Sequence, residues 1–328
     1  MKKSLIALAV LAASGAAMAQ SSVTTYGIAD VWFGTVKAGG VTQTKLDSGG
    51  VAGSRWGLKG SEDLGGGLKA NFDFQAGFGM DTGAGSSTTA TAFSRQSWVG
   101  FSGGFGALRL GRTTTAFDDV NGASDAMFDS APAPQNVNFK STKYSSRQSN
   151  MIYYQAPKFG GFSGALSYAL GEDKTATTGA SSTTSLNLNY GAGPVAVQFG
   201  YQKEDTAAQD DTAFTRLGGS FDFGMAKAKL VYGKVTNMGQ IKDAEATEWQ
   251  LGADVPVSKA LTLSASYAKS TDNAVAGDAK RSGFGLAGAY TLSKRTFLYA
   301  AASWNKTEKT GLADAKTDIF ALGVQHRF

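Results

Sequence analysis

The segment 68–78 alternates strictly between two kinds of side chain. Its even-numbered residues are apolar, and its odd-numbered residues are polar or small, namely Lys69, Asn71, Asp73, Gln75 and Gly77. A period of two sustained over this length predicts a β-strand with one apolar and one polar face. Similar alternation returns at 162–170, 186–190, 195–201, 249–255, 261–267 and 320–328. We therefore expect an all-β fold.

Composition narrows the class of β-protein. No segment after the N-terminal leader offers about eighteen consecutive apolar residues, which excludes a helical membrane protein. A transmembrane β-barrel carries its apolar side chains at alternate positions, so its overall hydropathy resembles that of a soluble protein. The chain has no cysteine, which excludes a disulfide scaffold, thiolate metal sites and cysteine nucleophiles.

The N-terminus has the pattern of a cleaved signal peptide. Lys2 and Lys3 precede a short apolar run at 5–12, and Ala17 and Ala19 supply a small-residue cleavage site. We predict a signal peptide at 1–19 and a mature domain at 20–328. Loss of the two lysines lowers the formal net charge from +5 to about +3. With no basic stripe along the chain, nucleic acid is not an expected partner.

The connections between predicted strands fall into two sets. Short ones lie at 191–194, 222–225, 256–259 and 291–295, whereas longer polar ones lie at 171–182, 204–212, 236–246, 270–281 and 305–316. Short turns at one rim and long loops at the other are typical of outer-membrane barrels. A secreted β-sandwich or β-helix is the alternative, but it gives no reason for this alternation. We read 34–50 as a loop and predict a 16-stranded antiparallel transmembrane β-barrel.

Charged side chains indicate which face of each strand lines the lumen. A Lys or Arg facing lipid at the bilayer midplane costs about 2–4 kcal/mol. Arg55 and Lys59 share one parity, as do Lys69 and Asp73, and Arg109 lies between apolar neighbours. These basic residues are therefore expected to point into the lumen. Arg147, two residues from Ser149, is expected on the same side.

Arg95 is harder to place. If it points inward and alternation is strict, Val99 and Phe101 also point inward and Trp98 faces lipid. A β-bulge would change that register, or the two apolar residues would pack inside the bottom of the barrel. We expect Arg95 to face the lumen.

The segment of about 112–143 is the longest predicted connection. Between Arg112 and Lys140 it has no basic residue but four acidic ones, Asp118, Asp119, Asp125 and Asp129. Side chains alone do not fill a sixteen-stranded barrel, so we expect this third loop to fold inside. Its acids would then face the wall arginines Arg55, Arg95 and Arg147 and create a transverse field.

Several motifs resemble the β-proteobacterial general porins, of the type found in Burkholderiales and Neisseria. RWGLKGSEDLGGGLKA at 55–70 resembles their second hairpin, FSRQSWVG at 93–100 their fourth strand, and LRLGR at 108–112 the approach to their constriction loop. APKFGGFSG at 156–164, LSKRT at 292–296 and the terminal HRF are also similar. The resemblance covers the whole mature chain.

The resemblance implies a homotrimer in the outer membrane of a Gram-negative bacterium, in contact with outer-membrane lipid and lipopolysaccharide. It implies constriction by the third loop, with Arg55, Arg95 and Arg147 at the wall positions. It also implies that Phe328 is the signal read by the barrel-assembly machinery. Gly27 and Ala29 on the outer face of the first strand, and the loop 80–92, are candidates for contact with a neighbouring subunit.

The predicted function is passive diffusion of small hydrophilic solutes and ions, with a preference for anions. One alternative is a substrate-selective channel for small carboxylates or phosphate, which the arginine cluster alone would favour. An adhesin or a closed structural barrel is a further alternative. An enzyme is not expected, because the only histidine, His326, lies on the predicted lipid face without an acid–base partner. We expect no cofactor and no metal site.

Overall fold

The computed structural model describes residues 22–85, 91–207 and 209–328. The signal peptide predicted at 1–19 lies outside the described residues, as does part of the loop 80–92. Cleavage of the signal peptide and contact of this loop with a neighbouring subunit therefore remain predictions. In the described part of the chain, no helix is long and apolar enough to cross a membrane.

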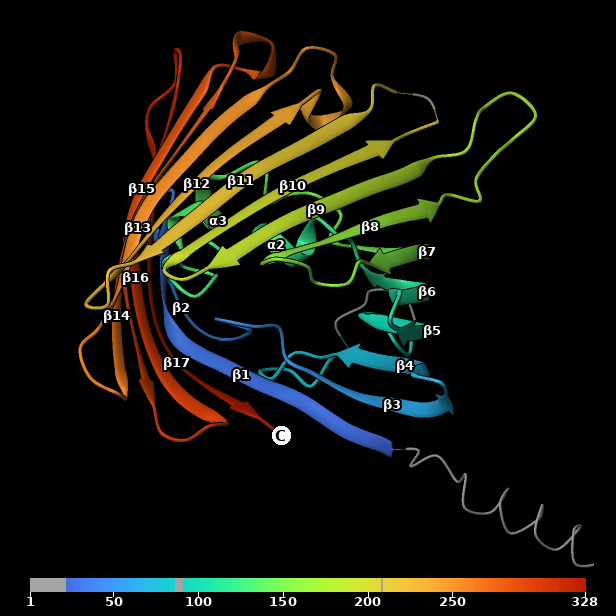
Figure 1. Ribbon diagram of the computed structural model, residues 1–328. Helices are drawn as coiled ribbons and strands as arrows, with labels where there is room; N and C mark the ends of the chain where they lie inside the picture. Colours follow the sequence, from blue (N-terminus) through green and yellow to red (C-terminus); the bar gives the residue numbers. More distant parts are fainter. Residues whose placement is uncertain (1–21, 86–90, 208) are drawn as a thin grey trace, which may run out of the picture.

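In the part of the chain that the structure describes, seventeen strands form one antiparallel sheet that closes on itself (Figure 1). The strands are β1 (Ser22–Ala38), β2 (Val41–Ser48), β3 (Arg55–Gly65), β4 (Leu68–Gly77), β5 (Gln96–Gly103), β6 (Gly106–Thr114), β7 (Arg147–Gln155), β8 (Phe162–Leu170), β9 (Ser182–Ala192), β10 (Val195–Asp205), β11 (Thr212–Asp222), β12 (Lys227–Thr236), β13 (Ala246–Pro256), β14 (Leu261–Asp272), β15 (Ala279–Thr291), β16 (Thr296–Lys309) and β17 (Ala315–Arg327).

Two of these strands share one position in the barrel. β2 pairs with the second half of β1, from Val31 onward, and β3 pairs with its first half, up to Ile28. The seventeen strands therefore make sixteen positions around the wall. β17 pairs with β1 on its other side and closes the ring. The prediction of a 16-stranded antiparallel barrel is confirmed.

The reading of 34–50 as a loop was wrong. β1 continues to Ala38, and β2 returns beside it as a hairpin. Gly39 and Gly40 form the two-residue turn with φ of 56° and 79°, a conformation that glycine adopts without steric cost and that suits tight hairpins. The polar, glycine-rich composition concealed the strand pattern.

The two faces of the wall differ as the alternation predicts. Large apolar side chains such as Leu188, Leu217 and Leu251 are exposed on the outer face. Polar side chains of opposite parity, such as Ser185 and Gln202, are buried on the inner face. Apolar side chains exposed over a large surface are unfavourable in water but favourable in contact with hydrocarbon. The outer surface therefore fits a lipid environment.

The register around Arg95, for which the sequence leaves two alternatives, follows from where β5 begins. Arg95 lies just before β5, outside the strand, so its direction does not determine the parity of the residues that follow. Val99 and Phe101 are 56% and 43% exposed on the outer face. Trp98 lies on the lumen side, where the guanidinium of Arg109 is 5.1 Å from its ring centre. Of the two alternatives, packing of Val99 and Phe101 inside the barrel is therefore excluded, and Arg95 needs no β-bulge to differ in direction from them.

The long loop after β6 folds inside the barrel. It spans 115–146, slightly displaced from the predicted 112–143, because β6 continues to Thr114 and β7 begins at Arg147. It contains two short helices, α2 (Asp118–Asn121) and α3 (Pro134–Asn138), which lie within the ring of strands (Figure 1). Elsewhere in the described residues, two 3₁₀ turns, η1 (Met238–Gln240) and η2 (Ala274–Ala276), occur in connections between strands.

The C-terminal residue completes the closure of the barrel. The main chain of Phe328 exchanges two hydrogen bonds with Gly27, at 3.0 and 3.1 Å. A Cβ atom added at Gly27 would lie 2.2 Å from the Phe328 ring. The open space at Gly27 is therefore filled by the chain's own terminus, and the idea that Gly27 admits a neighbouring subunit was wrong.

Candidate functional site

Three arginines from separate elements form a basic cluster on the lumen wall. Arg55 begins β3, Arg95 precedes β5 and Arg147 begins β7. Their guanidinium charges lie close enough to repel one another. Among the residues that the structure describes, none of the three forms an ion pair with an acid. We call this set the arginine wall.

Arg95 is oriented by the barrel behind it. Its Nε donates to Oε1 of Gln75 at 2.9 Å, and Nε2 of Gln75 donates to the Tyr26 hydroxyl at 2.8 Å. Tyr26 in turn donates to Oδ1 of Asp73 at 2.5 Å. A continuous hydrogen-bonded chain across β1 and β4 thus holds the guanidinium that faces the lumen.

Asp118 is the loop acid on which the arginine wall acts. The charges of Arg147, Arg95 and Arg55 all favour its ionised form, as does a 2.6 Å hydrogen bond from the Tyr144 hydroxyl to Oδ1. Partial burial in the loop outweighs these contributions and raises the pKa of Asp118. Of the four predicted acids, Asp118 alone faces all three wall arginines.

Asp119 belongs to a second group of lumen residues, together with Tyr153, Asn187 and Arg109. We call this group the second layer. Its Oδ2 accepts hydrogen bonds from the Tyr153 hydroxyl at 2.5 Å and from Nδ2 of Asn187 at 3.1 Å. The Arg109 guanidinium lies 4.7 Å from the ring centre of Tyr153, and its charge also acts on Asp119. Arg109 therefore faces the lumen as predicted, but it pairs with this layer and not with the arginine wall.

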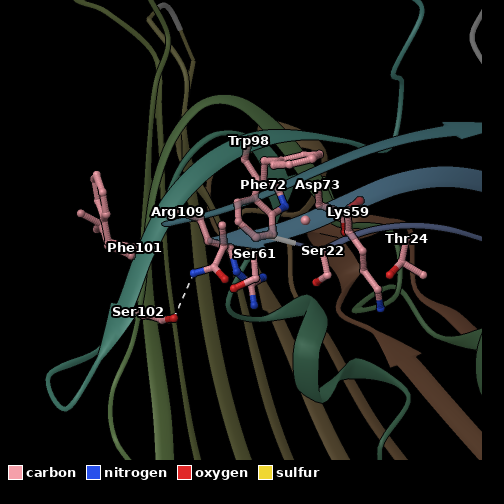
Figure 2. Close-up of a pocket in the computed structure, with 14 residues that line it drawn as sticks. Ser22, Thr24, Lys59, Ser61, Phe72, Asp73, Trp98, Phe101, Ser102 and Arg109 are labelled. Carbon is pink, nitrogen blue, oxygen red and sulfur yellow. Dashed lines mark hydrogen bonds between the residues drawn. The ribbon is translucent and has the colours of Figure 1, made fainter. Parts of the chain in front are cut away.

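A hollow of about 340 Å³ in the inner wall lies beside this second layer (Figure 2). Lys59, Asp73, Trp98 and Arg109 line it, and Figure 2 shows Phe101 turned away from the other labelled side chains. The Lys59 ammonium lies 4.9 Å from the Tyr26 ring centre, a cation–π contact that fixes it near Asp73. The hollow therefore carries two cations and one carboxylate.

The other predicted residues lie elsewhere. Asp125 is 1% exposed and faces the seam between loop and wall, where it accepts from Nε2 of Gln250 at 2.9 Å and from two loop amides. Its prediction as a lumen acid was wrong, since irregular loop backbone gives no parity to follow. Asp129 is open to the lumen but accepts from Asn136 within the loop, and it faces none of the wall arginines. Lys69 lies next to the β3–β4 turn at the rim.

The chain is similar to known proteins over nearly its whole length. A family model described as Gram-negative porin matches residues 5–310. The chain belongs to the Gram-negative porin family. Outer membrane porin protein 32 of Delftia acidovorans is 37% identical to this porin over 346 residues, covering 99% of this chain and 95% of that protein. An outer membrane porin protein of Bordetella pertussis is 31% identical over 388 residues, covering all of both.

The fold is also similar to that of solved porin structures. The structure described as an anion-selective porin from Comamonas acidovorans superposes with a TM-score of 0.81 and 28% identity, covering 94% of this chain and 100% of that one. OmpT of Vibrio cholerae with loop L8 deleted has a TM-score of 0.74 at 15% identity, which shows a shared fold. This porin is therefore a channel protein of the Gram-negative outer membrane, not an enzyme.

Several residues that hold the site were not found from the sequence. Arg216 on β11 is 1% exposed behind the loop and donates to Oε1 of Gln135 at 2.5 Å. Glu248 on β13 accepts from the amides of Lys140 and Ser141 and from the Ser270 hydroxyl. Both have the inward parity that alternation assigns, but alternation does not reveal what a side chain contacts across the lumen.

Arg112 and Arg327 are further basic neighbours of the arginine wall, and the charge of Arg327 acts on Arg55. Arg112 donates from Nε to the Ser94 carbonyl at 2.7 Å and from Nη1 to the Ser149 hydroxyl at 3.2 Å, and the charge of Arg147 acts on it. Within the described part of the chain, no group of three or more histidines or acids is arranged to hold a metal ion. The site is thus a set of charges lining a passage.

Proposed function

We propose that this porin is a general diffusion channel for small hydrophilic solutes and ions and that it prefers anions. The observation that carries the proposal is an imbalance of charge in the part of the lumen between loop 115–146 and the arginine wall, which we call the narrow zone. Arg55, Arg95 and Arg147 have no ion-pair partner within the described residues, whereas a single loop acid, Asp118, opposes them. A wall that is not neutralised by pairing leaves a positive potential across the passage, which raises the local concentration of anions.

The burial of Asp118 adds to the imbalance. Because burial raises its pKa, its charge is less favoured than that of an acid in open water. The arginines keep their charge at any physiological pH. A structural relative of this porin, the Comamonas acidovorans protein, is described as anion-selective, which supports the same sign of selectivity here.

The test is the reversal potential of the purified porin in a planar bilayer under a KCl gradient. We expect an anion-selective value for the wild type and a shift toward zero selectivity in the Arg95→Ala/Arg147→Ala double variant. Lys69→Ala, which removes a charge at the rim, is the matched control and should change the potential little. A cation-selective wild type would contradict the anion preference. An unchanged potential in the double variant would contradict the assignment to the arginine wall.

A second candidate is a channel with a preference for small carboxylates or phosphate. The hollow in Figure 2 favours it, because no hydrogen bond to a described residue occupies the guanidinium of Arg109 and hydroxyl and amide groups lie around it. Such a site would offer bidentate contacts to a carboxylate. Addition of a small dicarboxylate should then reduce the chloride current through wild type more than through Arg109→Ala. Equal reduction in both would leave the general channel as the function.

The proposal includes a homotrimer embedded in outer-membrane lipid and lipopolysaccharide, assembled by the machinery that reads the terminal Phe328. The apolar outer face supports membrane insertion. One fold relative, OmpT of Vibrio cholerae, is described in a trimer form. Mass measurement of the detergent-solubilised porin should give three chains per particle, and a monomer would contradict this part of the proposal.

A further inference from the structure

Among the described residues, Asp30 is the carboxylate that accepts the most hydrogen bonds, and it lies outside the arginine wall. It is on β1, fully buried, and no Lys or Arg of the described chain forms an ion pair with it. Five donors compensate for the missing counter-charge. They are the main-chain amides of Gly50, Val51 and Ala52, the Tyr299 hydroxyl and Nε2 of Gln325, at distances of 2.6–3.2 Å.

These donors come from two sides. Tyr299 and Gln325 belong to β16 and β17, the wall at the barrel closure. The three consecutive amides belong to residues 49–54, where the chain between β2 and β3 leaves the wall. We call 49–54 the inward segment. Consecutive amides turned toward one carboxylate form an anion-binding concavity, so Asp30 fixes the inward segment against the wall.

Register explains why this segment needs fixing. Ile28 pairs with Arg55 and Val31 pairs with Ser48, so only Ala29 and Asp30 of β1 lie opposite the six residues 49–54. The surplus chain has no partner strand and bulges into the lumen. There Gly50 touches Trp32 and Tyr299 so closely that an added Cβ would lie 2.1 Å from the Tyr299 hydroxyl.

The inward segment contacts both sides of the narrow zone. The Ala131 amide of the constriction loop donates to the Gly50 carbonyl at 2.8 Å, and within the described residues this is the one main-chain hydrogen bond that joins loop 115–146 to another part of the chain. On the other side, Gly53 packs against Nη1 of Arg95, and Arg55 follows directly. Loop tip and arginine wall therefore meet through 49–54.

We propose that Asp30 is a positioning residue of the channel: by holding the inward segment it sets the place of the loop tip relative to the arginine wall, and so the width of the passage. It acts through Gly50 and not by contact with the permeating ion. The inference rests on this porin conducting through the loop-narrowed lumen and is independent of the sign of its selectivity.

Two variants separate position from charge. Asp30→Asn removes the charge and replaces one of the two acceptor oxygens by an NH2 donor at similar volume, so some of the amides of 49–54 lose their acceptor. Gly50→Ala leaves every charge in place but forces the inward segment away from Tyr299. Asp205→Asn is the control, because Asp205 is a carboxylate at the end of β10 whose partners are Lys203 and Ser182 and not the inward segment.

The experiment records single-channel current in planar bilayers and the thermal unfolding of each purified barrel. In Asp30→Asn and in Gly50→Ala we expect loss of the single steady open level, with flickering between levels of different conductance; Asp205→Asn keeps the wild-type level. If Asp30→Asn does not fold, Tyr299→Phe removes one of the five donors and should show milder flickering. Folded variants with wild-type conductance and noise overturn the proposal. The proposal is also overturned if the reversal potential shifts in Asp30→Asn but not in Gly50→Ala. Asp30 would then act on the permeating ion through its charge and not by positioning the inward segment.

Discussion

Gln75 accepts the hydrogen bond from Nε of Arg95 at 2.9 Å and donates to the Tyr26 hydroxyl at 2.8 Å. Arginine side chains have many rotamers, so a guanidinium exposed to water would spread its charge over a wide volume. A bond to a buried amide on the barrel wall confines it. The position of the Arg95 charge therefore depends on Gln75 and Tyr26 behind it.

Replacing Gln75 by Leu should disorder Arg95 without changing any charge. The lost hydrogen bond to a charged group is worth about 1.5–3 kcal/mol, enough to release the side chain. We expect the reversal potential of Gln75→Leu to move toward that of Arg95→Ala. Asn71→Leu on the same strand, which breaks a 2.9 Å bond to Ser102, is the control. Equal effects of the two variants would contradict an orienting role for Gln75.

The anion preference should increase in mild acid. Although Asp119 is open to the lumen, the surrounding wall and loop limit its hydration, and the adjacent Asp118 repels its charge, so its pKa is raised to about 6. As the pH falls through that value the carboxylate takes up a proton and the lumen loses a negative charge. The same raised pKa means that protonation stabilises the folded loop.

The measurement is the reversal potential as a function of pH. Wild type should become more anion-selective between about pH 7 and pH 5, near the raised pKa. Asp119→Asn should be more anion-selective at neutral pH and should show a smaller step, since Asp129, which is also open to the lumen, has a pKa raised to about 6 as well. A step of full size in Asp119→Asn would assign the titration to another group.

The C-terminal half of the loop should depend on Glu248. Its carboxylate accepts from the Ser141 amide and the Ser270 hydroxyl, each at 3.0 Å, and from the Lys140 amide. Glu248→Gln leaves buried amides poorly paired, which costs about 1–3 kcal/mol. We expect a lower unfolding temperature and a noisier open current. Glu308→Gln, which breaks an exposed pair with Lys306 at the rim, should change neither.

The closure at the C-terminus should be sensitive to volume at Gly27. Gly27→Ala places a methyl group against the Phe328 ring and near the Arg55 carbonyl, and overpacking of this kind costs about 1–3 kcal/mol. The folded barrel should melt at a lower temperature. Adding Phe328→Ala should restore only part of the loss, because the main-chain clash remains. If the loss of stability in the double variant equals the sum of the losses in the two single variants, the ring and Gly27 are not coupled.

The barrel was predictable because lipid and water impose opposite demands on alternate residues. Arg55, Lys59 and Arg109 were placed correctly for that reason, since each lies within regular alternation. The direction of Arg95 gave no information on the register of β5, because Arg95 precedes that strand. Asp125 was placed incorrectly because loop backbone has no fixed parity. Asp30 was not found at all: its partners Tyr299 and Gln325 are 269 and 295 residues away in sequence, a separation at which local pattern says nothing about contact.

The interruption between β2 and β3 has a consequence for how such channels diversify. The circumference of the barrel depends on strand number and register, and β1 keeps its pairing on both sides of the gap. On the proposal that 49–54 sets the place of the loop tip, insertions or deletions there would alter the aperture while the hydrogen-bonded wall stays the same. Calibre and scaffold would then be separately adjustable, so that pore size could vary among related sequences without a new fold.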